Sequence, residues 1–460
     1  MKRLFGTDGM RGEAGRFPLD AATVRVTGRS LARHLAEQAQ GRRAPSIVVG
    51  RDTRESGPWL ERALIAGAME AGARVQSAGV ITTPGVAYLT RQLPADAGVV
   101  ISASHNPYED NGIKVFAPSG RKLDDATERR IEADIAAESA AEGGSIAPET
   151  DAVEDVTGAQ EASALRARYL DYLAGEVAAG LSLEGMSIAV DCANGAAYEL
   201  APALFRRLGA RVVAINSHPD GRNINRDCGS LHIEGLREKV FEERADLGVA
   251  FDGDADRALF IDARGTFVDG DATLWVMAQH LAARGRLRDG LVVATVMSNI
   301  GLEIALRSKG LRLLRADVGD KYVLEELLRT KASIGGEQSG HLIFPEESLA
   351  GDGMLTTLCL LRVMRETGAR LDALTEGFVR YPQVLVNVRV REKLPFDEVA
   401  RIAEVRRETE AQLGETGRLL LRYSGTEPLA RVMIEGERQE TIERYANRLA
   451  AAIRESIGAS

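Results

Sequence analysis

Three aspartates stand on alternate positions directly after a short apolar run, an arrangement that suits a bound cation. Asp252, Asp254 and Asp256 follow the letters GVAF in the segment DLGVAFDGDADR. On a single turn, three carboxylates repel one another strongly unless a cation lies among them. An all-oxygen ligand set selects a hard ion such as Mg²⁺ or Ca²⁺ over zinc. An EF-hand is excluded, because its sixth position would be Arg257 and its twelfth Ala263.

A phosphate could complete such a site, because Mg²⁺ commonly combines a few carboxylates with phosphate oxygens. Ser104 is the candidate to carry it, since it ends the apolar run AGVVISAS and would face a cleft at the carboxyl end of a strand. The nucleophile-elbow pattern GxSxG is absent around it, which argues against a hydrolase of that type. His105 is its neighbour, but adjacent residues of an extended chain point to opposite faces, which makes His105 a poor base for Ser104. The alternatives are a solvated acidic turn and an ordinary turn serine.

Two cations accompany these segments. Arg11 follows Asp8 near the N-terminus, and Lys114 ends the letters DNGIK. Either could neutralise a phosphoserine or move a proton. Taken alone, each would be a surface cation in a salt bridge that contributes little.

Two further loops carry groups that suit a sugar phosphate. The loop at 422–431 combines arginine and hydroxyl side chains with a glycine that lets backbone N–H groups approach an anion. It is not a Walker P-loop, because GxxxxGK[ST] does not occur. The loop GEQSGH at 336–341 places polar side chains between glycines, which suits hydrogen bonds to a polyol. The alternatives are ordinary loops and a structural histidine.

A threefold repeat is expected to position these loops. Each unit alternates apolar runs with helical stretches, which is typical of α/β layers. Because ligands gather at the carboxyl ends of parallel strands, we expect the loops SASHNP, DGDADR and GEQSGH to converge. The alternative is that any α/β chain looks repetitive. The apolar runs are IVVG, VQSAGV and AGVVISAS in the first unit, SIAV, RVVAI and DLGVAF in the second, and VVATVM, LRLLRA and ASIGG in the third.

The last segment breaks this pattern and predicts a small α+β domain. Apolar residues alternate from Val384 to Val390, as in a half-buried strand. A helical stretch near 396–413 and two strands around LLLRYS and RVMIEG follow. A closing helix repeats apolar residues every three or four positions from Ile442 to Ile457. The acidic stretch at 136–155 is the expected boundary between the first two domains.

Composition narrows the class of protein. The chain has 460 residues, which suggests about three domains, and 45% hydrophobic with 27% charged residues is typical of a globular protein. Lys+Arg 58 against Asp+Glu 67 excludes a broadly basic nucleic-acid binder. Three scattered cysteines offer no disulfide framework and no zinc site. The longest aliphatic runs are strand-sized and no signal-peptide pattern opens the chain, so we expect a cytoplasmic protein without a membrane partner.

Five strings together resemble the α-D-phosphohexomutase family, in family order and across the whole chain. Gln338 and the letters RYSGTEPLARVM point most closely to the bacterial branch that acts on glucosamine phosphates. We see no departure at a motif position. The strings are FGTDGMRG at 5–12, ISASHNPYEDNGIK at 101–114, FDGDADR at 251–257, GEQSGH at 336–341 and RYSGTEPLARVMIEG at 422–436.

The resemblance implies a fold of three related α/β domains, with mixed sheets between helices, and a smaller C-terminal α+β domain around a central cleft. The expected domains are 1–153 with a phosphoserine loop, 154–256 with a metal-binding loop, 257–370 with a sugar-binding loop, and 371–460 with a phosphate-binding loop. Ser104 would carry the phosphoryl group, with Lys114, Arg11 and His105 as catalytic partners. The metal ligands would be Ser104, Asp252, Asp254 and Asp256, and the substrate ligands Glu337, Ser339, His341, Arg422, Ser424, Gly425, Thr426 and Arg431.

The resemblance also implies an isomerase that interconverts glucosamine 6-phosphate and glucosamine 1-phosphate, feeding UDP-N-acetylglucosamine and cell-wall synthesis. It would use one Mg²⁺ per active site and a hexose 1,6-bisphosphate as activator. A homodimer, and a protein kinase or autophosphorylation as the source of the first phosphoryl group, are left open. The alternative in the same family is a phosphomannomutase/phosphoglucomutase. A metal-dependent phosphatase and a non-catalytic sugar-phosphate sensor are the other two classes.

Overall fold

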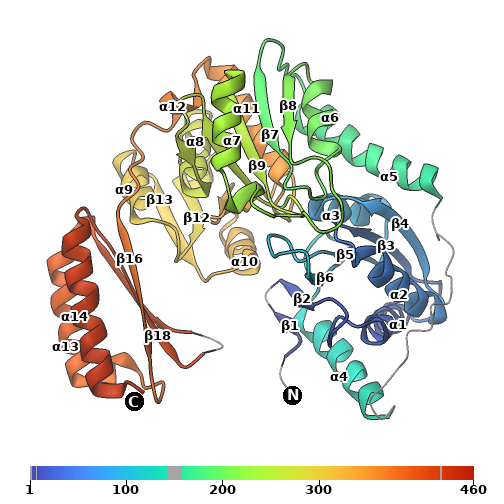
Figure 1. The fold of residues 1–460 in the computed structure, drawn as a ribbon, viewed down its shortest axis with the longest axis horizontal. Helices are drawn as coiled ribbons and strands as arrows, with labels where there is room; N and C mark the ends of the chain where they lie inside the picture. Colours follow the sequence, from blue (N-terminus) through green and yellow to red (C-terminus); the bar gives the residue numbers. More distant parts are fainter. Residues whose placement is uncertain (1–2, 7, 142–157, 425–426, 460) are drawn as a thin grey trace.

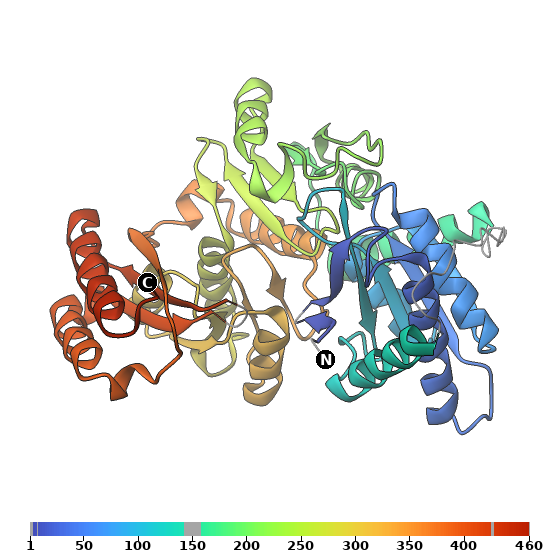
Figure 2. The ribbon, with the colours of Figure 1, turned by 60° about the horizontal axis from the view of Figure 1, so that its bottom comes forward.

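The computed structural model describes residues 3–6, 8–141, 158–424 and 427–459. Four units follow one another along an arc, and the last lies at one end of the molecule (Figures 1 and 2). Helices cover the sheets of the first three units, and the last is smaller. The expected fold class is therefore confirmed. Most of the acidic stretch at 136–155, together with the first expected domain boundary, lies outside the described residues.

Each unit has one sheet. The first unit has β1 (Phe5–Gly6), β2 (Gly9–Glu13), β3 (Ser46–Arg51), β4 (Arg74–Val80), β5 (Ala97–Ile101) and β6 (Asp110–Phe116). The second has β7 (Ser187–Asp191), β8 (Arg211–Ile215), β9 (Leu247–Phe251), β10 (Ala258–Asp262) and β11 (Phe267–Val268). The third has β12 (Leu291–Thr295), β13 (Arg312–Ala316), β14 (Gly335–Gly336) and β15 (Leu342–Ile343). The last has β16 (Gln383–Arg389), β17 (Arg418–Tyr423) and β18 (Leu429–Glu435).

The first three sheets repeat one arrangement. In the first unit, β3 is parallel to both β4 and β5, and β5 turns back into the antiparallel strand β6. The same pattern holds for β7 with β8, β9 and β10, and for β12 with β13, β14 and β15. Ser104 lies in the β5–β6 connection, the three aspartates in β9–β10, and GEQSGH in β14–β15. The three loops therefore occupy equivalent hairpins, as the repeat predicts.

Five of the described helices begin at a short polar side chain that caps them. Asp20, Thr82, Asp269, Asn299 and Asp352 each accept a hydrogen bond from the first turn of the helix that follows. No helix of the described residues combines the length and the apolar character needed to cross a membrane. The helices are α1 (Ala21–Gln38), α2 (Gly57–Glu70), α3 (Thr83–Gln92), α4 (Asp125–Ala141), α5 (Ala159–Tyr172), α6 (Leu200–Arg207), α7 (Glu234–Glu243), α8 (Gly270–Ala283), α9 (Ile300–Ser308), α10 (Asp320–Thr330), α11 (Gly353–Thr367), α12 (Leu371–Leu374), α13 (Ala400–Leu413) and α14 (Gln439–Ile457).

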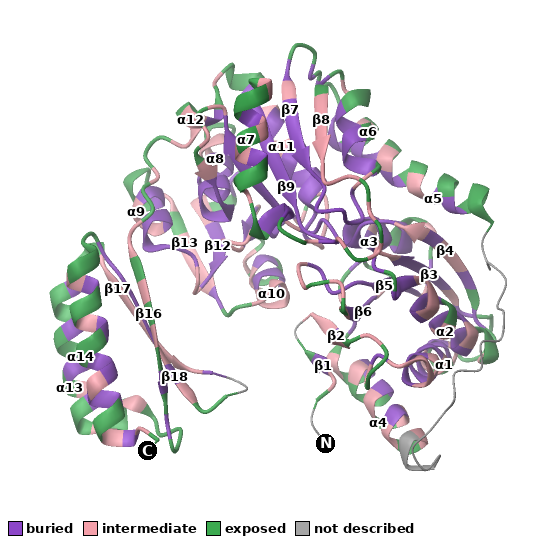
Figure 3. Ribbon diagram, viewed as in Figure 1, coloured by how far each residue is buried: buried purple, intermediate pink, exposed green. Residues whose placement is uncertain are grey.

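The first three units share a continuous core, whereas the last has its own. One cluster of buried side chains runs from Val48 in the first unit through Phe251 in the second to Leu358 in the third. In the last unit, Val388, Val432 and the apolar face of α14 form a separate cluster. Figure 3 shows its buried residues between the sheet and the two helices, with exposed residues on the outer side. The last unit is thus held as a separate body.

The separate core predicts a local effect of a core substitution. Ile453 is fully buried on α14, so Ile453→Ala should destabilise the last unit by about 2–5 kcal/mol. Segment-resolved hydrogen exchange should show faster exchange in residues 383–459 while the first three units stay protected. Asn447→Ala, on the exposed side of the same helix, should change stability by no more than about 0.5 kcal/mol. Equal loss of protection in all four units would contradict a separate core in the last unit.

Candidate active site

Ser104 lies at the carboxyl end of β5 in a left-handed backbone conformation. Its φ is 53°, a conformation that costs a residue with a side chain about 1–3 kcal/mol and is found mostly at functional sites. The Oγ of Ser102 holds this turn, because it accepts from the Ser104 amide at 2.9 Å and donates to Asp52 at 2.6 Å. Contrary to the expectation of an exposed serine, Ser104 is buried, because the loop of the second unit covers it.

The guanidinium of Arg54 holds the serine loop from behind. It is fully buried and donates to the carbonyl oxygens of Ser104 and Asn106, both at 2.9 Å, and to that of Asp110 at 3.0 Å. Its Nε donates to Asp52 at 2.9 Å. One side chain therefore fixes several carbonyl groups of a loop that has few backbone partners of its own.

The second unit reaches the same carbonyl groups. The Asn225 amide donates to the carbonyl oxygens of Ser104 at 2.9 Å and Asn106 at 3.0 Å. A Cβ on Gly253 would lie 2.5 Å from the carbonyl oxygen of Ser104, so only glycine lets the two loops approach this closely. Neither Arg54 nor Asn225 was expected from the sequence to take part in the site. For Arg54 a signal existed, because it lies in the turn after β3, at the sheet edge where Ser104 also lies.

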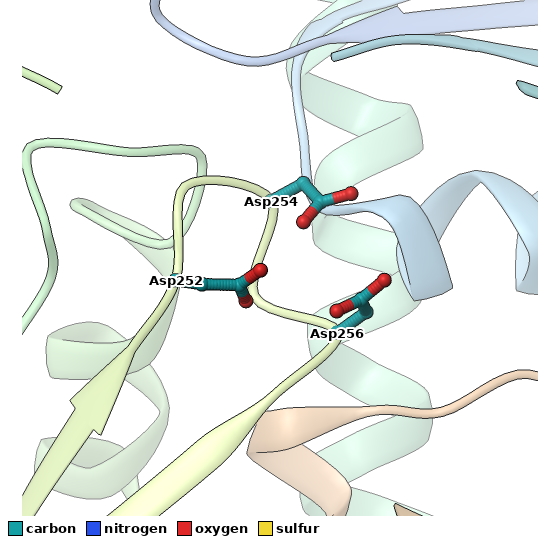
Figure 4. Close-up of side chains that lie close together, drawn as sticks. All are labelled: Asp252, Asp254 and Asp256. Atoms are coloured by element: carbon teal, nitrogen blue, oxygen red, sulfur yellow. The ribbon is translucent and has the colours of Figure 1, made fainter. Parts of the chain in front are cut away.

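The three aspartates form a buried cluster in the β9–β10 loop. Their side chains point toward one another (Figure 4), and one oxygen of each lies within 4.8 Å of the others. The Ser104 hydroxyl donates to Asp252 at 2.5 Å. Burial, together with Asp256 and Asp254, raises the pKa of Asp252 well above its usual value. Burial would also raise the pKa of Asp256, but Lys114 and His341 hold it well below the usual range.

This cluster fits a hard divalent cation. Asp254 Oδ1 is buried and has no hydrogen-bond partner, and Asp256 Oδ1 is buried with His341 Nδ1 at 3.5 Å. Unpaired buried carboxylate oxygens are unfavourable unless a cation compensates them. All available ligand atoms, including the hydroxyl of Ser104, are oxygens, as Mg²⁺ prefers. The triad is thus a candidate metal site.

Two cations lie on neighbouring strands of the first unit, and Lys114 contacts two of the aspartates. Lys114, on β6, is buried, and its Nζ lies 2.8 Å from Asp254, 3.2 Å from Asp8 and 3.3 Å from Asp256. Burial opposes its charge, but these three carboxylates raise the pKa of Lys114 well above its usual value. Arg11, on the neighbouring strand β2, pairs with Asp8 and donates to the carbonyl oxygen of Ala103 at 3.2 Å.

Two histidines lie beside the cluster, and one expectation about them is wrong. His105 Nδ1 lies 3.3 Å from the Ser104 hydroxyl. His105 was expected to point away from Ser104, as in an extended chain. Ser104 is left-handed, however, and the side chains of Ser104 and His105 lie on the same side. Burial and then Arg257 lower the pKa of His105 to about 4. Burial would lower the pKa of His341 as well, but Asp256, at 3.5 Å, raises it to about 9.

The loop at 336–341, which was expected to contact a sugar and is called the sugar loop below, lines a cleft of about 620 Å³. The buried Ser339 hydroxyl has no hydrogen-bond partner, whereas Glu337 accepts from the Gly319 amide at 3.2 Å. An unpaired hydroxyl in a cleft is suited to hydrogen-bond a ligand. The cleft is lined by Leu4, Gly6, Asp8, Gly9, Arg11, His105, Asp256, Arg257, Thr295, Met297, Val318, Gly319, Asp320, Glu337, Gln338, Ser339 and His341.

The last unit carries a candidate anion site that does not line this cleft. Arg422 and Arg431 are directly opposed across β17 and β18, and like charges in such a pair are destabilising unless an anion lies between them. Ser424 accepts from Arg431 at 3.4 Å, and Lys393, a further cation that the sequence analysis missed, donates to its carbonyl oxygen at 2.6 Å. Gly425 and Thr426 lie outside the described residues. The structure therefore brings the expected residues of the first three units together, and leaves Arg422, Ser424 and Arg431 apart.

The fold and this arrangement of loops define a class of enzyme, and family models agree. Descriptions for phosphoglucomutase/phosphomannomutase match residues 2–142 (alpha/beta/alpha domain I), 167–265 (domain II), 269–381 (domain III) and 385–452 (C-terminal domain). The chain belongs to the phosphoglucomutase/phosphomannomutase family.

Within that family, similar sequences are named phosphoglucosamine mutase. The protein of that name from Solibacter usitatus (strain Ellin6076) is 50% identical over 457 residues, covering 99% of each chain. The one from Koribacter versatilis (strain Ellin345) is 46% identical over 469 residues, covering 100% of this chain and 98% of that one.

Solved structures support the fold. A phosphoglucomutase/phosphomannomutase family protein from Burkholderia thailandensis aligns with a TM-score of 0.78 at 24% identity, over 99% of this chain and 98% of that one. The N-acetylphosphoglucosamine mutase of Aspergillus fumigatus, in complex with GlcNAc-6P and magnesium, aligns with a TM-score of 0.63 at 19% identity, over 99% and 96%.

The contacts of Arg54 predict a strong effect of Arg54→Lys. A lysine has one nitrogen and cannot reach all these carbonyl groups, so Ser104 should lose its position. We expect kcat/KM for a hexose phosphate to fall by about 100-fold, because small misplacements of reacting groups are costly. Arg51→Lys, which alters a partly exposed ion pair with Glu61, should leave the rate close to wild type. Full activity of Arg54→Lys would show that Arg54 does not position Ser104.

The unpaired carboxylate oxygen of Asp254 predicts that Asp254→Asn weakens metal binding. The change keeps the side chain's shape but removes one negative charge, so the Kd for Mn²⁺, followed by electron paramagnetic resonance, should rise at least about tenfold. Asp246→Asn, at an exposed carboxylate of the same unit, provides the control. An unchanged titration of Asp254→Asn would exclude the triad as the metal site.

Proposed function

We propose that this chain interconverts glucosamine 6-phosphate and glucosamine 1-phosphate through a phosphorylated Ser104 and a bound 1,6-bisphosphate. The observation that carries the proposal is the 2.5 Å hydrogen bond from the Ser104 hydroxyl to Asp252 inside a buried carboxylate cluster. A phosphoryl group on Ser104 would extend this oxygen-rich site. The relatives named phosphoglucosamine mutase, at 46–50% identity, support the amino sugar as substrate.

The reaction exchanges one phosphorus–oxygen bond for another. The bond from phosphorus to Ser104 Oγ breaks while a bond to O1 of the sugar forms. A proton leaves the O1 hydroxyl, and Ser104 Oγ takes one up. His105, at 3.3 Å, is the group we assign to this proton exchange. The reverse transfer from O6 returns the phosphoryl group to Ser104 after the bisphosphate has turned around.

Charge neutralisation and positioning supply most of the catalysis. Asp252, Asp254, Asp256 and a phosphate oxygen on Ser104 would hold Mg²⁺, which, when bound, neutralises charge on the transferring group. Lys114 contacts Asp254, and Arg11 donates to the carbonyl oxygen of Ala103, the residue before Ser104, so both would stabilise the negative charge that develops there.

The remaining residues hold the substrate. Glu337, Ser339 and His341 would bind the sugar, and Arg422, Ser424, Gly425, Thr426 and Arg431 the phosphate that does not react. Since the last unit does not line the cleft in this structure, we infer that it closes over the substrate. We also propose hexose 1,6-bisphosphate as the activator that loads Ser104, and domain boundaries at 153/154, 256/257 and 370/371.

A coupled mutase assay tests the proposal. With trace glucose 1,6-bisphosphate, the wild-type chain should convert glucosamine 6-phosphate with a higher kcat/KM than glucose or mannose phosphates. A preference for glucose or mannose phosphates would identify a phosphomannomutase/phosphoglucomutase instead. Release of inorganic phosphate in place of isomerisation would indicate a phosphatase.

Ser104→Ala tests the nucleophile. The variant removes only the acceptor oxygen, so it should fold as the wild type does and lose nearly all turnover. Intact mass should show one phosphoryl group on the wild type after incubation with glucose 1,6-bisphosphate and none on the variant. Activity at the wild-type level in Ser104→Ala would refute a phosphoserine mechanism.

A further inference from the structure

A buried polar cluster lies where the last unit joins the third. Its side chains are those of Asp271 on α8, Asn299 at the start of α9, and Glu435 at the end of β18, all at 1% exposure or less. Figure 1 shows α9 beside the segment that leads into β16. Polar groups at such depth are costly unless they are hydrogen-bonded, so their contacts hold the surrounding segments in place.

Asn299 uses all its side-chain hydrogen-bonding groups to join two units. Its Oδ1 accepts from the backbone N–H of Gly301, a contact that caps α9, and from the backbone N–H of Tyr381 at 2.9 Å. Its Nδ2 donates to the carbonyl oxygen of Tyr381 at 3.0 Å and to Glu435 at 3.1 Å. Tyr381 lies in the connection to the last unit and Glu435 within it. One side chain therefore binds both the linker and the sheet of the last unit.

The carboxylate of Glu435 strengthens this joint. It accepts from Arg418 at 2.7 Å, and Arg418 also donates to the carbonyl oxygen of Ser298 at 3.1 Å. A buried carboxylate that loses a partner is strongly unfavourable. The linker is close-packed here as well, because a Cβ on Gly301 would lie 1.9 Å from the carbonyl oxygen of Val379.

The same cluster reaches the sugar loop. Asp271 Oδ2 accepts from the backbone N–H of Asn299 at 2.7 Å and from the side chain of Gln338 at 3.1 Å. Gln338 lines the cleft between Glu337 and Ser339. One carboxylate oxygen is thus shared by the loop expected to contact the sugar and by the residue that holds the last unit.

We propose that Asn299 and Asp271 are positioning residues that set the last unit relative to the sugar loop through this single hydrogen-bond network. A sugar that shifts Gln338 alters a contact of Asp271 and so changes the joint that orients the anion site of the last unit. The inference rests on the proposed function, because it assigns the two loops to the two ends of one sugar phosphate.

Asn299→Ser and Asn299→Ala separate this role from helix capping. Serine can still cap α9, but its single hydroxyl cannot bridge Tyr381 and Glu435. If Asn299 positions the last unit, both variants should raise KM for glucosamine 6-phosphate by about tenfold, with kcat little changed. If it only caps the helix, Asn299→Ser should behave as wild type, which would overturn the proposal. Asp20→Ala, which removes the cap of α1 in the first unit, is the matched control.

A measurement on the protein without substrate separates this inference from the proposed function. In Asn299→Ser, the amides of residues 337–341 should exchange with deuterium about tenfold faster than in wild type. In Gln338→Ala, the amides of residues 381–387 should show a similar increase in exchange rate. Unchanged exchange at the distant segment in both variants would refute the link, whether or not the wild type is a mutase. The double variant Asn299→Ser/Gln338→Ala should lower kcat/KM no more than the more harmful of the two single changes. If instead the two fold-changes in kcat/KM multiply, the residues act independently.

Discussion

The charge balance around three buried carboxylates is the constraint on which the site depends. Asp252, Asp254 and Asp256 belong to the second unit, whereas Lys114, which pairs with Asp254 and Asp256, belongs to the first. Separated from each other, either group would leave uncompensated buried charge. The interface between the first two units and the chemistry of the site therefore rest on the same ion pairs. A divalent cation bound there would share this balance with Lys114.

The repeated hairpin explains how distant segments of the chain meet. Each of the first three sheets places a loop between a parallel strand and the antiparallel strand that follows. The loop of the first unit contains Ser104, that of the second contains the three aspartates, and that of the third is the sugar loop. The shared core fixes the three sheets against one another. Backbone hydrogen bonds hold the aspartate loop and the loop at 336–341, and the side chains of Arg54 and Asn225 hold the serine loop. Precision at the site thus comes from buried polar contacts on a rigid scaffold.

The sequence alone predicts the parts of this structure that depend on local pattern. Alternating and continuous apolar runs indicate the strands, and the spacing of the three aspartates indicates a cation site. It does not predict that Ser104 is left-handed, because that conformation is imposed by Arg54, Asn225 and Gly253 from other segments. For the same reason, the expectation that His105 points away from Ser104 was wrong. Lys393 and Asn299 were missed because their roles arise only from long-range packing.

The independent core of the last unit has a consequence for how such enzymes diversify. One covalent connection, the Asn299 cluster and a few polar contacts such as that of Arg418 with Ser298 join it to the third unit. A recombination event within that connection would exchange the whole anion site between relatives without disturbing any other hydrophobic packing. In the first three units, by contrast, one cluster of buried side chains is shared, and a crossover between them would divide it. The expected phosphate contacts can therefore be exchanged as one C-terminal module, apart from the loop expected to contact the sugar, provided that the module keeps Glu435 as the partner of Asn299.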